Sequence, residues 1–289
     1  MDSDNRTIWT LWMQGVDTAP PLVRACIESW RVLNPTWRVV ALDRATLGDW
    51  VDLDDIIDIS RRDITVQKQA VVARLALLKR YGGVWVDATV FCLRPLDAWL
   101  PAAHSAGFTA FRNPGRDRLA SNWFMAADSG NDLAVALYEA FIGFFNRHRF
   151  TNQETASGRA MVERLGRILN TSVRSTRWWL NPALQAVVRA YPYFIFHYIF
   201  NDVVLSDRRL RALWEHAPRL DAGPPHRLQD LGGAGDGPAR ALAELEQADW
   251  VLQKLDWRAD PASPYWSAVL ERMTALSIER SRQLRGPTP

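Results

Sequence analysis

Apolar residues along the chain follow two patterns of spacing, which alternate from one segment to the next. Short runs rich in β-branched and aromatic side chains predict strands, and longer segments with apolar residues every three or four positions predict helices. The expected strands cover residues 8–12, 37–42, 84–86, 107–111 and 122–127, and the expected helices cover residues 22–33, 66–81, 131–146, 154–169, 182–190 and 264–285. Strands that alternate with helices are typical of an α/β fold with a Rossmann-like nucleotide-binding sheet.

The stretch around which the rest is organised is residues 66–95, VQKQAVVARLALLKRYGGVWVDATVFCLRP. Its first half predicts a buried helix, with an apolar stripe on one side and Lys68 on another face. Gly82 and Gly83 end this helix, because glycine tolerates the positive φ that follows a helix end. A short strand comes next, and Asp87 stands where that strand stops. Ligands of open α/β sheets bind beyond the carboxyl ends of the strands, so we expect Asp87 to face a ligand.

Asp87 has a structural interpretation as well as a functional one. A strand-end aspartate often caps a turn, but this one is followed directly by apolar sequence, where a charged group is costly unless it has a partner. Arg74 lies within the apolar part of the preceding helix and needs an anionic partner of its own. A salt bridge to Asp87 or another core acid meets that need, and so does an anionic ligand. The two interpretations are compatible.

Residues 74–89, RLALLKRYGGVWVDAT, resemble the signature of the capsular polysaccharide synthesis proteins. These proteins are grouped with the sugar-nucleotide transferases that carry a DXD motif on a GT-A fold. Weaker blocks occur in the order expected of that family: IWTLWMQG at 8–15, SWRVLNPTW at 29–37, WFMAA at 123–127, FIFHYIF at 194–200 and KLDW at 254–257. The resemblance extends over roughly residues 8–257.

The resemblance implies a single GT-A-type domain over residues 1–289, with a Rossmann-like nucleotide-binding sheet and added helices. The implied activity is glycosyl transfer from a UDP- or GDP-linked sugar. The implied acceptor is a carbohydrate, such as a capsular or surface polysaccharide, or a small natural product. A retaining outcome is implied by analogy with DXD relatives, and such a reaction needs no dedicated catalytic base.

The same resemblance assigns roles to individual residues. The implied catalytic group is Asp87, Arg74 and Lys254. Lys254 and Arg74 would also bind the donor, and the further donor-binding residues are Trp12, Gln14, Asp43, Thr89 and Trp257. Trp12 would stack on the nucleobase. The residues expected on the acceptor side are Trp123, His197 and Asp202, although His197 has an equal interpretation as a satisfied histidine of the core.

A divalent cation, Mn²⁺ or Mg²⁺, is the cofactor that the DXD resemblance implies, with Asp87 as its ligand. The chain departs from the family pattern at three positions. Thr89 stands where a second carboxylate would grip the ion, Gln253 replaces a histidine ligand, and Val71 replaces an aspartate that contacts the donor sugar. A neutral hydroxyl is a poor substitute for an anionic oxygen ligand. These departures weaken the expectation that the activity depends on metal.

The same departures keep two other functions open. One is a non-catalytic module of the same fold that binds a sugar nucleotide or a glycan without turnover. The other is a hydrolase with paired carboxylates, which would cleave a glycan without any nucleotide. The hydrolase is less favoured, because no Asp/Glu pair stands out at the strand ends.

Composition and charge narrow the class of protein. Of the 289 residues, 48% are hydrophobic and 23% are charged, which is the usual balance of a globular domain. The net charge of +3 fits an anionic small ligand or an anionic surface, but the basic residues form no dense run, which argues against nucleic acid as a partner. Cys26 and Cys92 are too few for a disulfide framework and predict a reducing compartment.

Targeting signals and loops complete the expectations. Residues 1–9 do not resemble a secretory signal, and no apolar run reaches the ~20 residues of a spanning helix. We therefore expect a cytoplasmic protein that is able to associate peripherally with a membrane. Residues 221–239, DAGPPHRLQDLGGAGDGPA, are rich in Gly and Pro and predict a mobile loop. Because loops near such sites often close over the substrate, we expect this loop to act as a lid.

Overall fold

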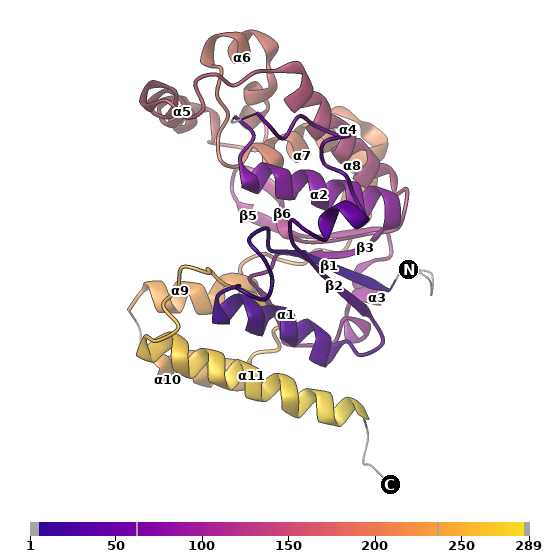
Figure 1. Ribbon diagram of the computed structural model, residues 1–289, viewed down its shortest axis with the longest axis vertical. Helices are drawn as coiled ribbons and strands as arrows, with labels where there is room; N and C mark the ends of the chain where they lie inside the picture. Colours follow the sequence, from indigo (N-terminus) through magenta and orange to yellow (C-terminus); the bar gives the residue numbers. More distant parts are fainter. Residues whose placement is uncertain (1–5, 62, 236, 286–289) are drawn as a thin grey trace.

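A computed structural model describes residues 6–61, 63–235 and 237–285, and it places a central sheet between two groups of helices (Figure 1). The strands of this sheet are β1 (Thr7–Leu11), β2 (Arg38–Leu42), β3 (Gly83–Val86), β5 (Phe108–Gly115) and β6 (Arg118–Ala127). A second, two-stranded sheet consists of β4 (Val90–Cys92) and β7 (Leu252–Lys254).

Helices cover both faces of the central sheet. The α-helices are α1 (Pro21–Leu33), α2 (Val66–Tyr81), α3 (Leu100–Ala103), α4 (Asp132–Arg147), α5 (Ala156–Leu169), α6 (Pro182–Val188), α7 (Ile195–Ser206), α8 (Arg208–His216), α9 (Arg227–Gly233), α10 (Pro238–Gln247) and α11 (Pro264–Arg285). The 3-10 helices are η2 (Leu47–Asp49), η3 (Leu96–Ala98), η4 (Ser175–Leu180) and η5 (Pro224–His226). In Figure 1, α2, α4, α7 and α8 lie on one side of the sheet, and α1, α9, α10 and α11 lie on the other. The predicted C-terminal helix over residues 264–285 is confirmed.

The central sheet is mixed, with the strand order β2-β1-β3-β6-β5. β1 pairs in parallel with both β2 and β3, whereas β6 pairs antiparallel with β3 and with β5. The expected α/β class is confirmed. Ligands are expected to bind beyond the carboxyl ends of the parallel strands. The antiparallel strands β5 and β6 follow each other closely in sequence, as a tight hairpin allows.

Side chains of the central strands alternate between the two helix layers, as a period of two requires. Trp9, Trp85 and Met125 point into the larger core, where they meet residues of α2, α4 and α7. Ile8 and Val84 point to the opposite face, into a cluster that includes α1 residues. Both faces of β1 and β3 are therefore buried, and only the ends of these strands are free to meet a ligand.

Helix α2 is the centre of the larger core and is enclosed on nearly all sides. All residues from 71 to 78 are buried, and the helix contacts α4 as well as β1, β3 and β6. Lys68, which we expected on a face other than that of the apolar stripe, is buried as well. The aromatic rings of Tyr191 and Tyr193 pack beside its ammonium group and cover the first turn of α2.

Gly82 and Gly83 end α2 as predicted and turn the chain directly into β3. Gly82 has a φ of 66°, and its amide donates to the carbonyl of Leu78 at 3.0 Å. Gly83 has a φ of 92°, and a Cβ at this position would lie 2.5 Å from the carbonyl oxygen of Thr7. The second glycine is thus required both by the backbone conformation and by the close approach of β3 to β1.

Residues 221–239, which we expected to form a mobile loop, contain η5, α9 and the start of α10. Prolines occupy the first turns of η5 and α10, where the missing N–H has no helical partner to lose. Gly232 packs against α11, where a Cβ would lie 2.8 Å from the ring of Tyr265. Leu228 and Leu231 anchor α9 in a buried cluster. Glycine and proline here serve close packing and helix starts, and the lid function stays a prediction.

No helix in the described part of the chain combines the length and apolar character that a membrane crossing requires. The interpretation of residues 1–9 rests partly on residues 1–5, which lie outside the described residues. Both cysteines are buried and remain free thiols.

Candidate functional site

Asp87 lies at the carboxyl end of β3, where the chain leaves the central sheet. Its backbone amide donates to the carbonyl of Trp123 at 2.8 Å, which fixes the position of this residue beside β6. Its carboxylate oxygen Oδ1 accepts hydrogen bonds from Arg74 Nη2 at 2.6 Å and from Trp85 Nε1 at 2.9 Å. The carboxylate is 29% exposed, so one of its sides is held by the protein while another remains accessible.

Arg74 is the buried partner of this pair, and its side chain is only 4% exposed. The guanidinium lies over the ring of Trp85, with 4.8 Å between the guanidinium carbon and the ring centroid. Burial lowers the pKa of Arg74, and the charge of Asp87 opposes that shift. Nε and Nη1 are buried without a hydrogen-bond partner among the described residues. Unmatched buried donors are uncommon in cores, and a bound anionic ligand is one explanation for the two on Arg74.

Lys254 is brought to the same place from the far end of the chain. In the antiparallel pairing of β4 with β7, Lys254 lies opposite Val90. Its Nζ donates to Thr89 Oγ1 at 2.6 Å and to the carbonyl of Leu255 at 2.9 Å. Burial lowers the pKa of Lys254, and the nearby charge of Asp87 opposes that shift. One buried cation on α2, Arg74, and one half-buried cation on β7, Lys254, therefore lie around one partly exposed carboxylate.

Two tryptophans expected to bind the donor also meet in the structure. The rings of Trp12 and Trp257 lie edge to face with 6.0 Å between their centroids. Trp12 follows β1, and Trp257 follows β7 two residues after Leu255, whose amide donates to the carbonyl of Thr89 at 2.8 Å. The Trp257 side chain is 48% exposed. An exposed indole beside the charged cluster is suited to stack on a planar ring.

Asp43 and Gln14 lie in the turns that follow β2 and β1. The carboxylate of Asp43 accepts from the backbone amides of Ala45 and Thr46, at 2.9 and 3.0 Å, and these bonds lower its pKa. The carbonyl of Gln14 accepts from the Thr18 hydroxyl at 3.3 Å. The contacts of Asp43 are those of a turn cap, and its contact with a nucleoside stays a prediction.

The three residues expected on the acceptor side each contact a different partner within the protein. Trp123 is buried against Phe111, with 4.8 Å between the ring centroids. His197 is buried with Nδ1 2.7 Å from the carbonyl oxygen of Ala120, and burial lowers its pKa to about 3, so the ring is neutral near pH 7. Asp202 forms a salt bridge with Arg177 at 2.6 Å. These contacts favour structural roles for the three side chains.

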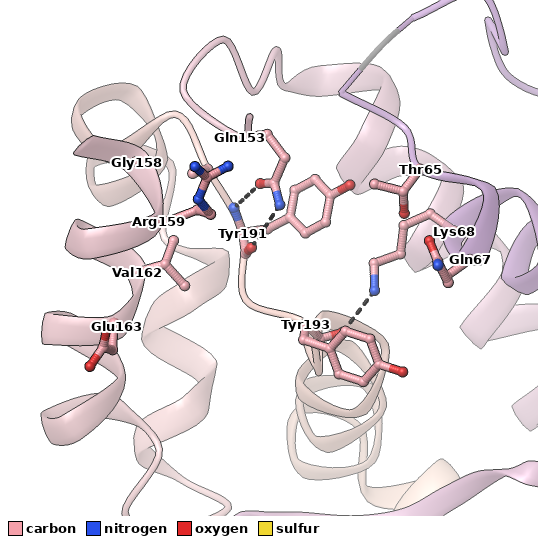
Figure 2. Close-up of a pocket in the computed structure, with 11 residues that line it drawn as sticks. Thr65, Gln67, Lys68, Gln153, Gly158, Arg159, Val162, Glu163, Tyr191 and Tyr193 are labelled. Atoms are coloured by element: carbon pink, nitrogen blue, oxygen red, sulfur yellow. Dashed lines mark hydrogen bonds between the residues drawn. The ribbon is translucent and has the colours of Figure 1, made fainter. Parts of the chain in front are cut away.

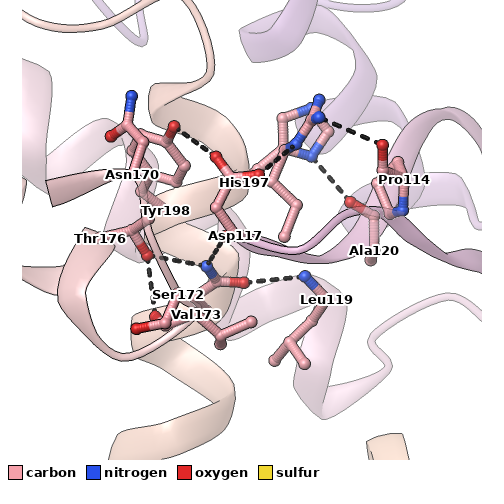
Figure 3. Close-up of polar contacts among 12 residues, drawn as sticks. Pro114, Asp117, Leu119, Ala120, Asn170, Ser172, Val173, Thr176, His197 and Tyr198 are labelled. Atoms are coloured by element: carbon pink, nitrogen blue, oxygen red, sulfur yellow. Dashed lines mark hydrogen bonds and ion pairs between the residues drawn. The ribbon is translucent and has the colours of Figure 1, made fainter. Parts of the chain in front are cut away.

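A buried polar network that the sequence did not reveal lies beside His197 (Figure 3). Asn201 on α7 donates to the carbonyl of Asp117 at 2.8 Å and to the Thr176 hydroxyl at 2.9 Å, and it accepts from the amide of Leu119 at 3.1 Å. The hydroxyl of Tyr198 donates to the carboxylate of Asp117 at 2.8 Å. These bonds tie α7 and η4 to the turn between β5 and β6. No sequence motif marks the network, because its members come from three separate segments.

The donor set around Asp87 does not fit a divalent cation held by the protein. Among the described residues, no group of three or more His, Cys, Asp and Glu side chains lies close enough to hold a metal ion. The hydroxyl of Thr89 is already engaged by the Lys254 ammonium, and two cations stand where a metal would need anionic ligands. Asp87 supplies a single carboxylate, and its Oδ1 is already engaged by Arg74.

Comparison with known proteins brings these observations together. Residues 1–152 match a family model described as capsular polysaccharide synthesis protein. The chain is 30% identical over 159 residues to an O-glycosyltransferase, braB, of Annulohypoxylon truncatum, a match that covers 48% of this chain and 37% of that protein. It is 32% identical over 108 residues to a glycosyltransferase, afumC, of Aspergillus fumigatus, covering 34% of this chain and 28% of that protein.

A third relative is also named a glycosyltransferase and is also matched over only part of its length. The chain is 25% identical over 138 residues to an O-glycosyltransferase, PaGT, of Phomopsis amygdali, covering 42% of this chain and 34% of that protein. The matched part of the chain thus spans about a third of the length of these curated relatives. A solved structure named PaToxG Glycosyltransferase superposes with a TM-score of 0.37 and 10% identity, over 73% of this chain and 87% of that one. A superposition this loose carries no information about the site.

Proposed function

The chain belongs to the capsular polysaccharide synthesis protein family, and we propose that it is a glycosyltransferase with a GT-A-type sheet. It moves a sugar from a nucleoside diphosphate, UDP- or GDP-linked, to a carbohydrate or small-molecule acceptor. The observation that carries the proposal is the cluster of Asp87, Arg74 and Lys254 at the carboxyl end of β3. Two cations and one carboxylate at that edge match the chemistry of a sugar diphosphate.

The cations match the charge that develops during transfer. The bond between the anomeric carbon and the diphosphate oxygen breaks, and its electron pair stays with the departing phosphate. The acceptor oxygen bonds to the anomeric carbon, and the acceptor proton passes to that phosphate. Fixed positive charge beside a departing diphosphate is the largest contribution a site of this kind offers. We assign this role to Lys254 and Arg74, in place of a protein-bound Mn²⁺ or Mg²⁺.

The remaining roles follow from accessibility. Asp87 is held through Oδ1 by Arg74, so its exposed side is suited to accept hydrogen bonds from hydroxyls of the ribose or the donor sugar. Trp257 and Trp12 are suited to stack on the nucleobase, since they lie together beside the Lys254 strand. A retaining outcome is part of the proposal, because it needs no separate base. Cytoplasmic location and peripheral association with a membrane stay predictions.

A second candidate function is a non-catalytic module that binds a sugar nucleotide or glycan. It is favoured by the hydrogen bond from Lys254 to Thr89, because a threonine there leaves the site one carboxylate short of the DXD pattern. Both candidates predict binding of a nucleotide sugar, and only the transferase predicts its turnover.

The test measures donor binding and turnover separately. UDP- and GDP-sugars are titrated against the protein by calorimetry, with and without Mn²⁺, and release of the nucleoside diphosphate is then followed with and without candidate acceptors. Binding with release supports the transferase, and binding without release under any condition supports the binding module. If no nucleotide sugar binds, both proposals are wrong. The same measurements on Asp87→Asn test the role of the carboxylate in the cluster. Asp249→Asn is its control, because Asp249 is an exposed carboxylate that pairs with Arg94.

A further inference from the structure

A cavity of about 350 Å³ opens between α2, α5 and the segment that leads into α7 (Figure 2). Its walls carry polar, charged and aromatic side chains. Those with polar groups are Thr65, Gln67, Lys68, Gln153, Arg159, Glu163, Tyr191 and Tyr193. The volume is within the range of small-molecule sites. None of these residues belongs to the Asp87 cluster.

Lys68 is the buried charge of this cavity. Its side chain is 6% exposed, and its ammonium lies 5.6 and 5.2 Å from the ring centroids of Tyr191 and Tyr193. Nζ donates to the carbonyl oxygen of Tyr193 at 2.7 Å. An ammonium has three N–H donors, and no carboxylate forms an ion pair with Lys68 among the described residues. A buried cation with spare donors and no counter-ion attracts an anion.

The opposite wall adds positive charge. Figure 2 shows Arg159 reaching from α5 toward the cavity from the side opposite Lys68. Its Nη1 donates to the backbone carbonyl of Glu154 at 3.0 Å, and this contact neutralises no charge. Glu163 is the one carboxylate among the described lining residues, and it is bonded to Arg167 at 2.9 Å. The cavity is therefore positively charged from two sides.

The cavity adjoins the Asp87 cluster through α2. Lys68 and Arg74 lie on the same helix, six residues and about 9 Å of helix rise apart. Their charges act on each other, since Arg74 contributes to lowering the pKa of Lys68. Tyr193, which lines the cavity, also lies close enough to affect the pKa of Arg74. A molecule bound at Lys68 would thus lie next to the proposed donor site.

We propose that this cavity binds the acceptor, and that the acceptor is a small ring-bearing molecule with an anionic group, a carboxylate or a phosphate, held by Lys68 and Arg159. The rings of Tyr191 and Tyr193 supply flat apolar surface for the ring of that molecule. Naming the ligand as the acceptor rests on the proposed function. The anion site itself does not.

The test uses three probes that each carry one benzene ring, are of similar size and differ in charge. 4-Hydroxybenzoate carries a carboxylate, phenyl phosphate carries a phosphate, and methyl 4-hydroxybenzoate is neutral. Each is titrated by NMR against the wild type, Lys68→Met, Arg159→Met and Lys79→Met. Lys79 is the matched control, because it lies on the same helix but beside Tyr138 and Glu139, outside the cavity.

We expect at least one anionic probe to bind the wild type and Lys79→Met with equal affinity, and to bind Lys68→Met at least about tenfold more weakly. Arg159→Met, at an exposed position, should weaken binding without any effect on folding. The neutral ester should bind as weakly to the wild type as the anions bind to Lys68→Met. The stronger of the two anions identifies the group that the site prefers.

Several outcomes would overturn the proposal: equal affinity for the ester and the anions, unchanged affinity in Lys68→Met, or no binding of any probe up to its solubility limit. A UDP- and GDP-sugar titration on the same variants separates this result from the proposed function. Lys68-dependent anion binding without donor binding would remove the transferase but keep the anion site. Donor turnover that no anionic probe stimulates or competes with would remove the acceptor role.

Discussion

Arg74 and Asp87 form an ion pair whose two members differ sharply in exposure. Nη2 and Oδ1 are 2.6 Å apart, with the guanidinium 4% exposed and the carboxylate 29% exposed. The arginine is therefore enclosed by the protein while the carboxylate reaches the edge of the sheet. The pair meets the structural interpretation of Asp87, because it gives Arg74 an anionic partner, and it leaves the accessible side of the carboxylate for the ligand that we propose.

Substitution of Asp87 tests this pair directly. Asp87→Asn keeps the shape and one hydrogen-bond acceptor but removes the charge, and we expect donor turnover to fall by about 10²–10³. The free energy of unfolding should also fall, because Arg74 is left as an uncompensated buried charge. Product release assays and urea denaturation measure the two effects. Near-normal turnover in Asp87→Asn, with Asp249→Asn as the control, would contradict the assignment.

Lys254 should act through its charge on the diphosphate. Lys254→Met is expected to weaken donor binding by about tenfold or more, since a charge-assisted contact is lost. Burial holds the pKa of Lys254 below its usual 10.5, so the ammonium deprotonates at lower pH than an exposed lysine does. Donor affinity of the wild type should therefore fall as the pH rises toward 10.5, and that dependence should be absent from Lys254→Met. Calorimetric titration across this range is the measurement.

Lys68 should make stability rise with pH, in the opposite sense from a lysine whose pKa is raised by an anionic partner. Burial lowers its pKa to about 8 from 10.5, so the unfolded chain binds more protons than the folded one between these values. The penalty of the buried ammonium is fully present below pH 8 and disappears as the pH rises to 10.5. The titratable groups that act on it or lie beside it are Arg74, His197, Tyr191 and Tyr193.

The wild type should accordingly gain about 3 kcal/mol relative to Lys68→Met across that pH range. Urea denaturation of the two proteins at several pH values gives the difference, in which the other titrating groups largely cancel. A constant difference between them would mean that Lys68 is solvated in the folded protein.

Gly83 should tolerate no side chain. Gly83→Ala places a Cβ 2.5 Å from the Thr7 carbonyl oxygen at a φ of 92°, and we expect it to lower the free energy of unfolding by more than about 2 kcal/mol. Gly48→Ala is the control, because a Cβ there meets nothing within 4 Å. Thermal or urea denaturation compares them. Equal stability of the two variants would contradict the close approach of β3 to β1.

Chelation should leave the activity largely intact. The cluster of Asp87, Arg74 and Lys254 supplies one carboxylate and two cations, and the Thr89 hydroxyl is engaged by Lys254. The cluster therefore has few oxygen ligands for a divalent ion. We expect turnover in EDTA to stay within about twofold of turnover with Mn²⁺ or Mg²⁺, because cationic side chains supply the charge compensation. Complete loss in EDTA with recovery on Mn²⁺ addition would restore the metal-dependent mechanism of the DXD pattern.

The hydrophobic pattern and the motif at residues 74–89 were sufficient to predict the first half of the central sheet and its helices. The alternation of apolar runs predicted β1, α1, β2, α2 and β3 with errors of one or two residues. The helix end at Gly82 and Gly83, and the position of Asp87 beyond β3, also follow from residues that are neighbours in sequence. Turn chemistry and hydrophobic periodicity act over a few residues, so a single sequence is enough to read them.

The tertiary structure decided what depends on distant contacts. Lys254 reaches Thr89 only because β7 pairs with β4, and Lys68 becomes a buried cation only because the segment at Tyr191 and Tyr193 folds over α2. Gly232 of α9 packs closely against Tyr265 of α11, and Leu228 and Leu231 of α9 lie in one buried cluster with residues of α11. A residue's own neighbours in sequence set its backbone preference, whereas its burial and charge partners come from segments that only the folded chain brings together.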